Sequence, residues 1–150
     1  MSLEKDIHQT TFRNEYHKVT VNIIFTYNWM MERSRRLFEK ADLTPQQYNI
    51  LRILRGAAKP LSTLQIRQRM LDKMSDTSRI VDRLLKKELV EKVICKTDRR
   101  LVDVTISNKG MALLENLDEF NNEFDDMLKG LSEEDAGMLN RLLDKVRSSD

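Results

Sequence analysis

Residues 75–107, SDTSRIVDRLLKKELVEKVICKTDRRLVDVTIS, decide the fold of this chain. Up to about Glu88, apolar and small side chains recur at spacings of three and four residues, which predicts an amphipathic helix. Two runs rich in β-branched residues follow, 90–95 and 101–106, on either side of a polar tip, which predicts a β-hairpin. The inward face of the helix is expected to hold Thr77, Val81 and Leu84.

Four helices are expected before the hairpin. A stripe of apolar side chains at helical spacing predicts a long helix over about residues 11–40. The Thr-Pro pair at 44–45 is a helix-start signal, and Ser62 is suited to cap a short helix after it. Ser75 or Asp76 is suited to cap the helix of the quoted stretch.

Two more helices are expected after the hairpin. Ser107 is suited to cap a helix that ends at Gly130, and Ser132 to cap a last helix with three acids in its first turn. This order predicts a mainly α fold, a winged helix-turn-helix DNA-binding lobe with long N- and C-terminal dimerisation helices. The expected boundaries are a single winged-helix domain over 1–150, a DNA-binding lobe over about 44–106, and dimerisation helices over about 11–40 and 107–148.

The flanking helices carry more apolar surface than one small lobe covers, which predicts a homodimer. The side chains expected at the dimer interface are Phe12, Tyr16, Val19, Phe124, Leu139, Leu142 and Val146.

Charge is distributed unevenly along the chain. Residues 45–110 carry 15 basic and 7 acidic side chains, whereas residues 111–150 carry 4 basic and 11 acidic ones. A basic middle segment favours a polyanion as partner, although a solvated charged face is the plainer explanation. The N-terminus has no apolar signal region, and no apolar run is long enough to span a membrane. A single cysteine, Cys95, fits a cytoplasmic location.

The outward face of the helix in the quoted stretch has the side chains of a DNA reader. Arg79 is placed to pair with guanine in the major groove, while Arg83, Lys86 and Lys87 are better suited to phosphates. The expected recognition-helix contacts are Ser75, Asp76, Ser78, Arg79, Arg83 and Lys86. An ordinary amphipathic helix with solvated charges is the alternative.

The hairpin tip strengthens the DNA interpretation. Its basic side chains are suited to the negative potential of a narrow minor groove, and Asp98 is suited to hold Arg100 extended by a salt bridge. The expected wing contacts are Lys96, Asp98, Arg99 and Arg100.

TSRIVDRLLKKELVEKV, followed by TDRRLVDVTISNKG, resembles the recognition helix and wing of the MarR (multiple antibiotic resistance regulator) family. The resemblance implies that Arg100 is the minor-groove arginine and that Ser62 and Thr63, at the start of the preceding helix, contact the DNA backbone. One departure is Glu88, where the family usually has glycine. A left-handed residue there would be strained, so a locally different helix end is expected.

The resemblance also implies a small aromatic effector, with no other cofactor. Candidate pocket residues are Tyr27, Trp29, Met30, Met31 and Tyr48, although core or dimer packing is the more ordinary role for each. Cys95 is expected in a wing strand as a buried, inert thiol rather than a redox sensor. His8 and His17 lack neighbours at metal-ligand spacing, so no metal site is expected.

We therefore expect a sequence-specific, DNA-binding transcription regulator, a ligand-responsive repressor that binds a palindromic operator in double-stranded DNA. The alternative is a winged-helix module that binds protein without sequence-specific DNA binding. No nucleophile–base arrangement or phosphate-binding glycine loop is present in the sequence, so enzymatic activity is not expected.

Overall fold

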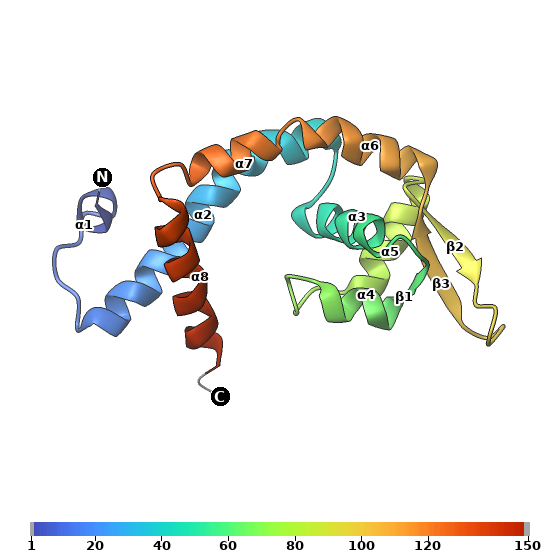
Figure 1. The fold of residues 1–150 in the computed structure, drawn as a ribbon, viewed down its shortest axis with the longest axis horizontal. Coiled ribbons are helices and arrows are strands. Elements are labelled where there is room, and N and C mark those ends of the chain that lie inside the picture. The colour runs from blue at the N-terminus through green and yellow to red at the C-terminus, as the bar shows by residue number, and fades with distance from the viewer. Residues whose placement is uncertain (1, 149–150) are drawn as a thin grey trace. The chain divides into compact units, whose positions relative to one another are not determined.

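The computed structural model describes residues 2–148 (Figure 1). They form two compact units, one up to Arg36 and the other from Leu37 onward. The first unit contains α1 (Leu3–Asp6), which the sequence did not predict, and most of α2 (Glu15–Ala41). The expected start of the long helix near residue 11 is wrong. The helix instead begins at Glu15, and Asn14 caps it, because the Asn14 side-chain oxygen accepts a hydrogen bond from His17 N at 2.9 Å.

The second unit contains the winged helix-turn-helix, and α3 lies at its centre. This helix packs against α4, α5, α6 and β3, and its Ile50, Leu51 and Leu54 are buried. The elements after α2 are α3 (Pro45–Ala57), β1 (Leu61–Ser62), α4 (Thr63–Arg69), α5 (Thr77–Lys86), β2 (Val90–Ile94), β3 (Val102–Ile106), α6 (Asn108–Asp118), α7 (Asn121–Met127) and α8 (Glu133–Arg147).

Hydroxyl and carboxylate caps fix where these helices begin, as the sequence predicted. Thr44, Ser62 and Ser132 each accept a bond from the backbone three residues later, and the side chain at that later position bonds back to the cap backbone. Ser107 accepts from the backbone N–H of Gly110. Of the two candidates for α5, Asp76 is the cap.

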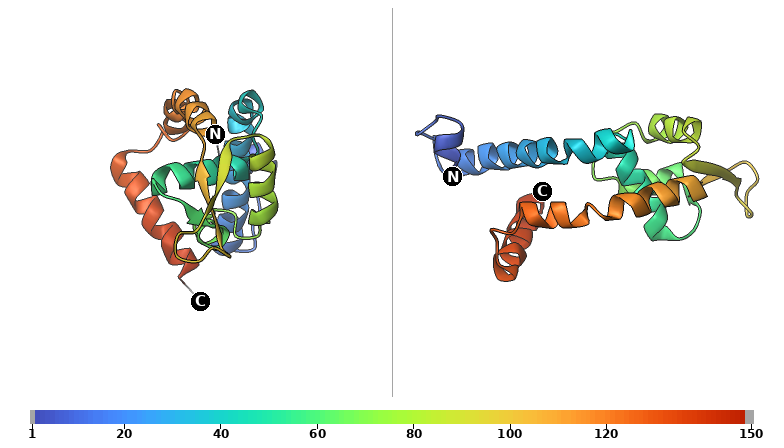
Figure 2. Two further views of the ribbon diagram at one scale, coloured as in Figure 1. Left: turned by 90° about the vertical axis from the view of Figure 1, so that its right-hand side faces the viewer. Right: turned by 90° about the horizontal axis from the view of Figure 1, so that it is seen from above.

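The three strands form an antiparallel sheet in the order β1-β3-β2. Val90 pairs with Ile106 at the base of the predicted hairpin, which projects away from the helices of its unit (Figure 2). The two-residue strand β1 was not predicted. Leu61 is fully buried and pairs with Val104, so this short strand ties the segment before α4 to the hairpin.

The single helix expected between Ser107 and Gly130 is interrupted, giving α6 and α7. At the break, Phe120 N donates to Leu117 O and Glu123 N donates to Phe120 O, so bonds spanning three residues replace the α-helical ladder. Phe120 is packed against the buried core there. Since no glycine or proline stands at this break, we attribute it to tertiary packing rather than to a helix-breaking residue.

The exit of α5 keeps the left-handed turn although the residue there is glutamate. Glu88 has φ 61°, and Leu89 N donates to Leu84 O at 3.1 Å. The expected local difference is therefore wrong. Ser107 Oγ donates to Glu88 O at 2.7 Å and Ser107 N to Leu89 O at 3.1 Å, so the start of α6 holds this strained residue in place.

Within residues 2–148, no helix is long and apolar enough to cross a membrane.

Candidate nucleic-acid interface

Helix α5 buries the predicted face and exposes the predicted basic one. Thr77, Val81 and Leu84 are buried, and the Thr77 hydroxyl is the one buried side-chain polar atom without a hydrogen-bond partner among residues 2–148. The exposed residues of the opposite face are Ser78, Arg79, Asp82, Arg83 and Lys86. Four of the six expected recognition-helix contacts, Ser78, Arg79, Arg83 and Lys86, are thus exposed on one face of the helix. Their contact with DNA stays a prediction.

Asp76 organises the first turn of α5. One carboxylate oxygen accepts from Arg79 N at 3.2 Å, and the other lies 3.3 Å from Arg79 Nε. The Arg79 side chain remains 81 % exposed. The cap therefore fixes the backbone N–H and Nε of Arg79, while the rest of its guanidinium has donors that face solvent.

Ser62, Thr63 and Ser75 lie where the first turns of α4 and α5 approach each other. Ser62 Oγ accepts from Gln65 N at 3.2 Å, and Ser75 Oγ donates to Asp72 O at 2.8 Å, so both hydroxyls have local structural partners. A hollow of about 390 Å³ lies here, lined by Thr63, Leu64, Arg67, Ser75, Asp76, Thr77 and Ser78.

The wing tip has the salt bridge expected from the sequence. Arg100 Nε and Nη2 donate to the two carboxylate oxygens of Asp98 at 3.1 and 3.2 Å, and Arg100 N donates to the same group at 3.0 Å. These bonds hold the pKa of Asp98 below its usual value. Arg100 is 91 % exposed, and Lys96 and Arg99 are also exposed. The wing therefore presents a pre-oriented arginine at low entropic cost.

Lys87 does not face solvent as a free phosphate contact. Its ammonium donates to the backbone carbonyl of Asp42 and to the Asp42 carboxylate, the latter at 3.1 Å. Lys109 Nζ in turn donates to Lys87 O at 3.0 Å. The expectation was wrong because the partner lies in the turn between α2 and α3, far away in sequence.

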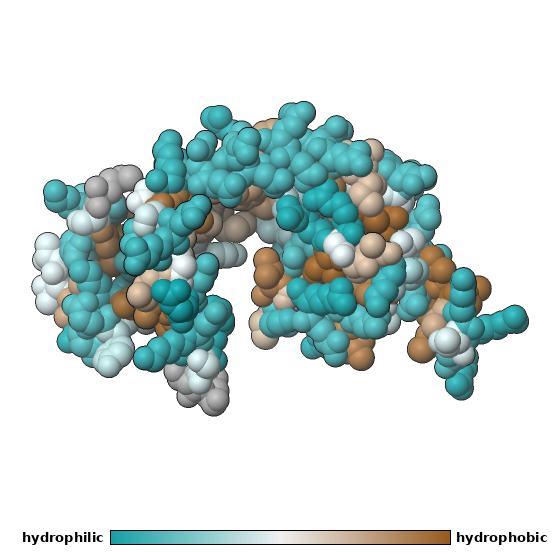
Figure 3. Space-filling model, in the orientation of Figure 1, coloured by the Kyte–Doolittle hydropathy of each residue, from teal (hydrophilic) through white to brown (hydrophobic). Residues whose placement is uncertain are grey.

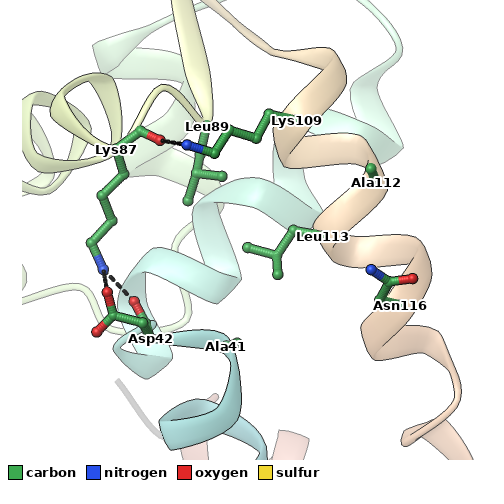
Figure 4. A pocket seen from close by; sticks show the side chains of 8 residues that line it. All are labelled: Ala41, Asp42, Lys87, Leu89, Lys109, Ala112, Leu113 and Asn116. Atoms are coloured by element: carbon green, nitrogen blue, oxygen red, sulfur yellow. Dashed lines mark hydrogen bonds and ion pairs between the residues drawn. The ribbon is translucent and has the colours of Figure 1, made fainter.

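These lysines border a hollow of about 460 Å³ (Figure 4). Leu89 and Leu113 point into it, and the Lys87–Asp42 and Lys109–Lys87 bonds close one side. The lining residues are Ala41, Asp42, Lys87, Leu89, Lys109, Ala112, Leu113 and Asn116. The hollow thus joins the end of α2, the exit of α5 and the first turns of α6.

The residues predicted to line an effector pocket are divided between the two units. Tyr27, Trp29, Met30 and Met31 belong to α2 in the first unit, where the Arg33 guanidinium lies 4.4 Å from the Trp29 ring centre. Tyr48 belongs to α3 in the second unit and meets the Phe38 ring edge-on at 5.7 Å. The pocket stays a prediction.

The side chains predicted for a dimer interface differ in exposure. Tyr16 and Val19 on α2, and Leu139, Leu142 and Val146 on α8, are exposed large apolar groups. Phe124 instead packs against the core, and Phe12 lies beside the His17 ring at 5.7 Å. Exposed apolar residues on both helices are what an unpaired dimer interface looks like in one chain.

Cys95 differs from its expected environment. It follows the end of β2, is half-buried, and its sulfur lies 3.1 Å from Thr97 Oγ1. The Thr97 hydroxyl, with backbone groups of the tip, lowers the pKa of the Cys95 thiol. A buried thiol within a strand is therefore wrong for this residue. In the part of the chain that the structure describes, no cluster of His, Cys, Asp or Glu is arranged to hold a metal ion.

Comparison with known proteins places this geometry among transcription regulators. Residues 41–101 match the model of the MarR family. The regulator MhqR of Bacillus subtilis is 28 % identical over 131 residues, covering 86 % of this chain and 89 % of that protein. The repressor IacR of Pseudomonas putida is 30 % identical over 116 residues, covering 77 % and 69 %.

Solved structures share the fold. Mutant MarR from E. coli, complexed with operator DNA, has a TM-score of 0.78 at 23 % identity, covering 91 % of this chain and 99 % of that one. BpsR of Bordetella bronchiseptica, whose DNA binding is regulated by 6-hydroxynicotinic acid, has a TM-score of 0.80 at 20 % identity. The match covers 93 % of this chain and 100 % of that one. The winged helix-turn-helix expected from the sequence is confirmed.

Proposed function

This chain belongs to the MarR family of transcription regulators, and from that premise we propose that it binds a palindromic operator as a dimer and represses nearby genes. One observation carries the proposal: the exposed basic face of α5 and the pre-oriented Arg100 of the wing belong to the same compact unit. A helix that enters the major groove beside a basic wing suited to the minor groove is the geometry of a DNA reader.

The exposed side chains divide into base contacts and backbone contacts. Arg79 lies in the first turn of α5, where a recognition helix meets base edges, and it reads guanine. Arg83 and Lys86 lie further along the helix and bind phosphates, giving affinity without sequence information. Ser62 and Thr63, at the start of α4, contact the DNA backbone. Asp98 holds the Arg100 guanidinium by a salt bridge, and Arg100 enters the minor groove.

Dimerisation supplies the twofold symmetry that a palindrome requires. The exposed apolar residues of α2 and α8 form the interface, which buries more than about 2,000 Å² in an obligate dimer. Leu142→Asp weakens the dimer and DNA binding together, because a charge at the interface loses its water on assembly. Analytical ultracentrifugation at micromolar concentration tests this, and a monomeric parent protein contradicts it.

A small aromatic effector biases the spacing of the two DNA-binding lobes by binding one arrangement more tightly than the other. Support comes from BpsR, whose DNA binding is regulated by 6-hydroxynicotinic acid. Titration of the protein–operator complex with 6-hydroxynicotinic acid tests responsiveness. Amide chemical shifts then distinguish binding at Trp29 in α2 from binding at the hollow that Leu89 and Leu113 line (Figure 4).

The central experiment separates base reading from backbone binding. Arg79→Ala costs roughly 1–3 kcal/mol on the operator and relaxes the preference at one base pair in each half-site. Arg100→Ala weakens binding to specific and random DNA more evenly and lowers the salt slope by about two per dimer. Lys129→Ala, an exposed lysine of the acidic C-terminal segment, is the matched control and leaves binding unchanged. Half-site centres lie roughly 10 base pairs apart.

The alternative, a module that binds an acidic protein, predicts a different pattern. Both modes weaken in salt, so salt dependence does not separate them. Competition by unlabelled operator against scrambled DNA does, because only a sequence-specific reader distinguishes them. If neither Arg79→Ala nor Arg100→Ala changes DNA affinity while the protein stays folded, the protein-binding module takes precedence.

A further inference from the structure

The loop between α4 and α5 exposes two large apolar side chains. Met74 is 94 % exposed, more than any other large hydrophobic residue of the described chain, and Leu71 is 86 % exposed. Apolar surface is visible at the edge of the second unit where this loop lies (Figures 1 and 3).

The exposure does not come from a loose loop, because hydrogen bonds fix its backbone on both sides. Leu71 N donates to Asn49 Oδ1 of α3 at 2.9 Å. Asp72 accepts from Met74 N at 3.0 Å and from Gln46 Nε2 of α3 at 3.2 Å. The exposure of Leu71 and Met74 is therefore a property of the folded loop, and both side chains are available to a partner.

Two further bonds connect the loop to the recognition helix. Ser75 N and Oγ both donate to Asp72 O, at 3.3 and 2.8 Å, directly before the cap Asp76. Met74 is therefore held at the N-terminal end of α5, the end that a recognition helix directs at base edges. Leu71 is anchored on the α3 side of the loop instead.

The charge around Met74 selects the partner. Residues 67–79 carry four basic and two acidic side chains, and those before Met74 include Arg67, Arg69 and Lys73. An apolar group within a basic surface that continues into the recognition helix fits DNA. The apolar group that the major groove offers is the 5-methyl of thymine, and a flexible, polarisable thioether packs well against it.

We propose that Met74 reads a thymine methyl group in each half-site of the operator, beside the bases that Arg79 contacts. The inference rests on the proposed function and names a specificity residue for it. Leu71, equally apolar but held on the other side of the loop, does not read that methyl group.

The test compares thymine with uracil, which differs only by this methyl group. The parent protein first selects an operator from random duplexes. Variants of this operator are then prepared in which one thymine position at a time is replaced by uracil, in both half-sites. Fluorescence anisotropy then gives the affinity of the parent, Met74→Ala and Leu71→Ala for each duplex. Both substitutions replace exposed side chains, and circular dichroism confirms that the variants remain folded.

We expect one thymine position at which uracil weakens parent binding by about fourfold per half-site, the effect of burying one methyl group, and hence about fifteenfold per dimer. At that position Met74→Ala loses most of this sensitivity, whereas Leu71→Ala keeps it. Equal uracil sensitivity in the parent and Met74→Ala at every position overturns the inference and leaves the proposed function intact. Failure of the parent to select any sequence overturns both.

A change of oligomeric state in Met74→Ala, with unchanged uracil sensitivity, assigns the exposed pair to a protein contact and also overturns the inference.

Discussion

Among the four glycines of the chain, Gly110 is the one where an added methyl group should do most damage to the lobe. A Cβ atom built there lies 2.2 Å from Leu89 O and 2.9 Å from Ile106 Cγ1. Leu89 O is not free to move, because it accepts a bond from Ser107 N at 3.1 Å. Gly110→Ala therefore forces the start of α6 away from the exit of the recognition helix.

The size of the effect follows from two opposing terms. Alanine is about 1 kcal/mol more favourable than glycine in a helix. Overpacking costs about 1–3 kcal/mol, and a clash with fixed backbone belongs at the upper end of that range. We expect Gly110→Ala to lower the free energy of unfolding by about 2 kcal/mol.

Gly137→Ala in α8 is the matched control, since its nearest neighbour is the flexible end of Arg141 at 3.6 Å. There the helix-propensity term acts alone and stabilises by up to about 1 kcal/mol. Urea unfolding followed by circular dichroism measures both variants at one protein concentration, because dimerisation makes stability depend on concentration. If Gly110→Ala is as stable as the parent, the reasoning from close backbone approach is refuted.

Three further changes test other features. Glu88→Gly removes a side chain from a left-handed residue at φ 61°. The relief of about 1–2 kcal/mol of backbone strain exceeds the entropy cost of glycine, so the midpoint of thermal unfolding rises. A lower midpoint contradicts the strain. Thr77→Val removes the buried hydroxyl without a partner and raises the free energy of unfolding by about 1 kcal/mol in urea titrations, whereas a loss points to a missed partner. The Arg55 guanidinium, bonded at 2.7 and 2.9 Å, lowers the pKa of Asp118. The stability that this pair supplies is present above the unfolded pKa of about 3.9 and is lost as pH falls through the lowered folded value. Asp118→Asn therefore shows a shallower loss of stability in acid than the parent, and equal stability profiles against pH exclude the link.

Local signals made most of the fold predictable from the sequence. Thr44, Ser62 and Ser107 act on backbone groups within three residues, so their capping roles are visible in the sequence alone. The Asp98–Arg100 salt bridge is local for the same reason. The position of Asn14 as the cap of α2 is also a local signal, but the apolar stripe that begins before it hid the true start.

The features that were missed depend on residues distant in sequence. The break at Phe120 follows from packing against the core, and the partner of Lys87 is Asp42 at the end of another helix. The role proposed for Met74 depends on a loop fixed by two side chains of α3, Gln46 and Asn49. Sequence periodicity identifies the face of a helix, but it does not reveal which exposed side chains the rest of the molecule has already engaged.

The pairing of Leu61 with Val104 has a consequence for how the lobe opens. Because β1 precedes α4 and β3 follows β2, this pair closes a loop of chain that contains both helices of the helix-turn-helix. The two helices therefore belong to one cooperative unfolding unit with the sheet, and neither peels away from an end. Amide hydrogens of α5 and of β3 should exchange with solvent through the same opening event, at similar free energies.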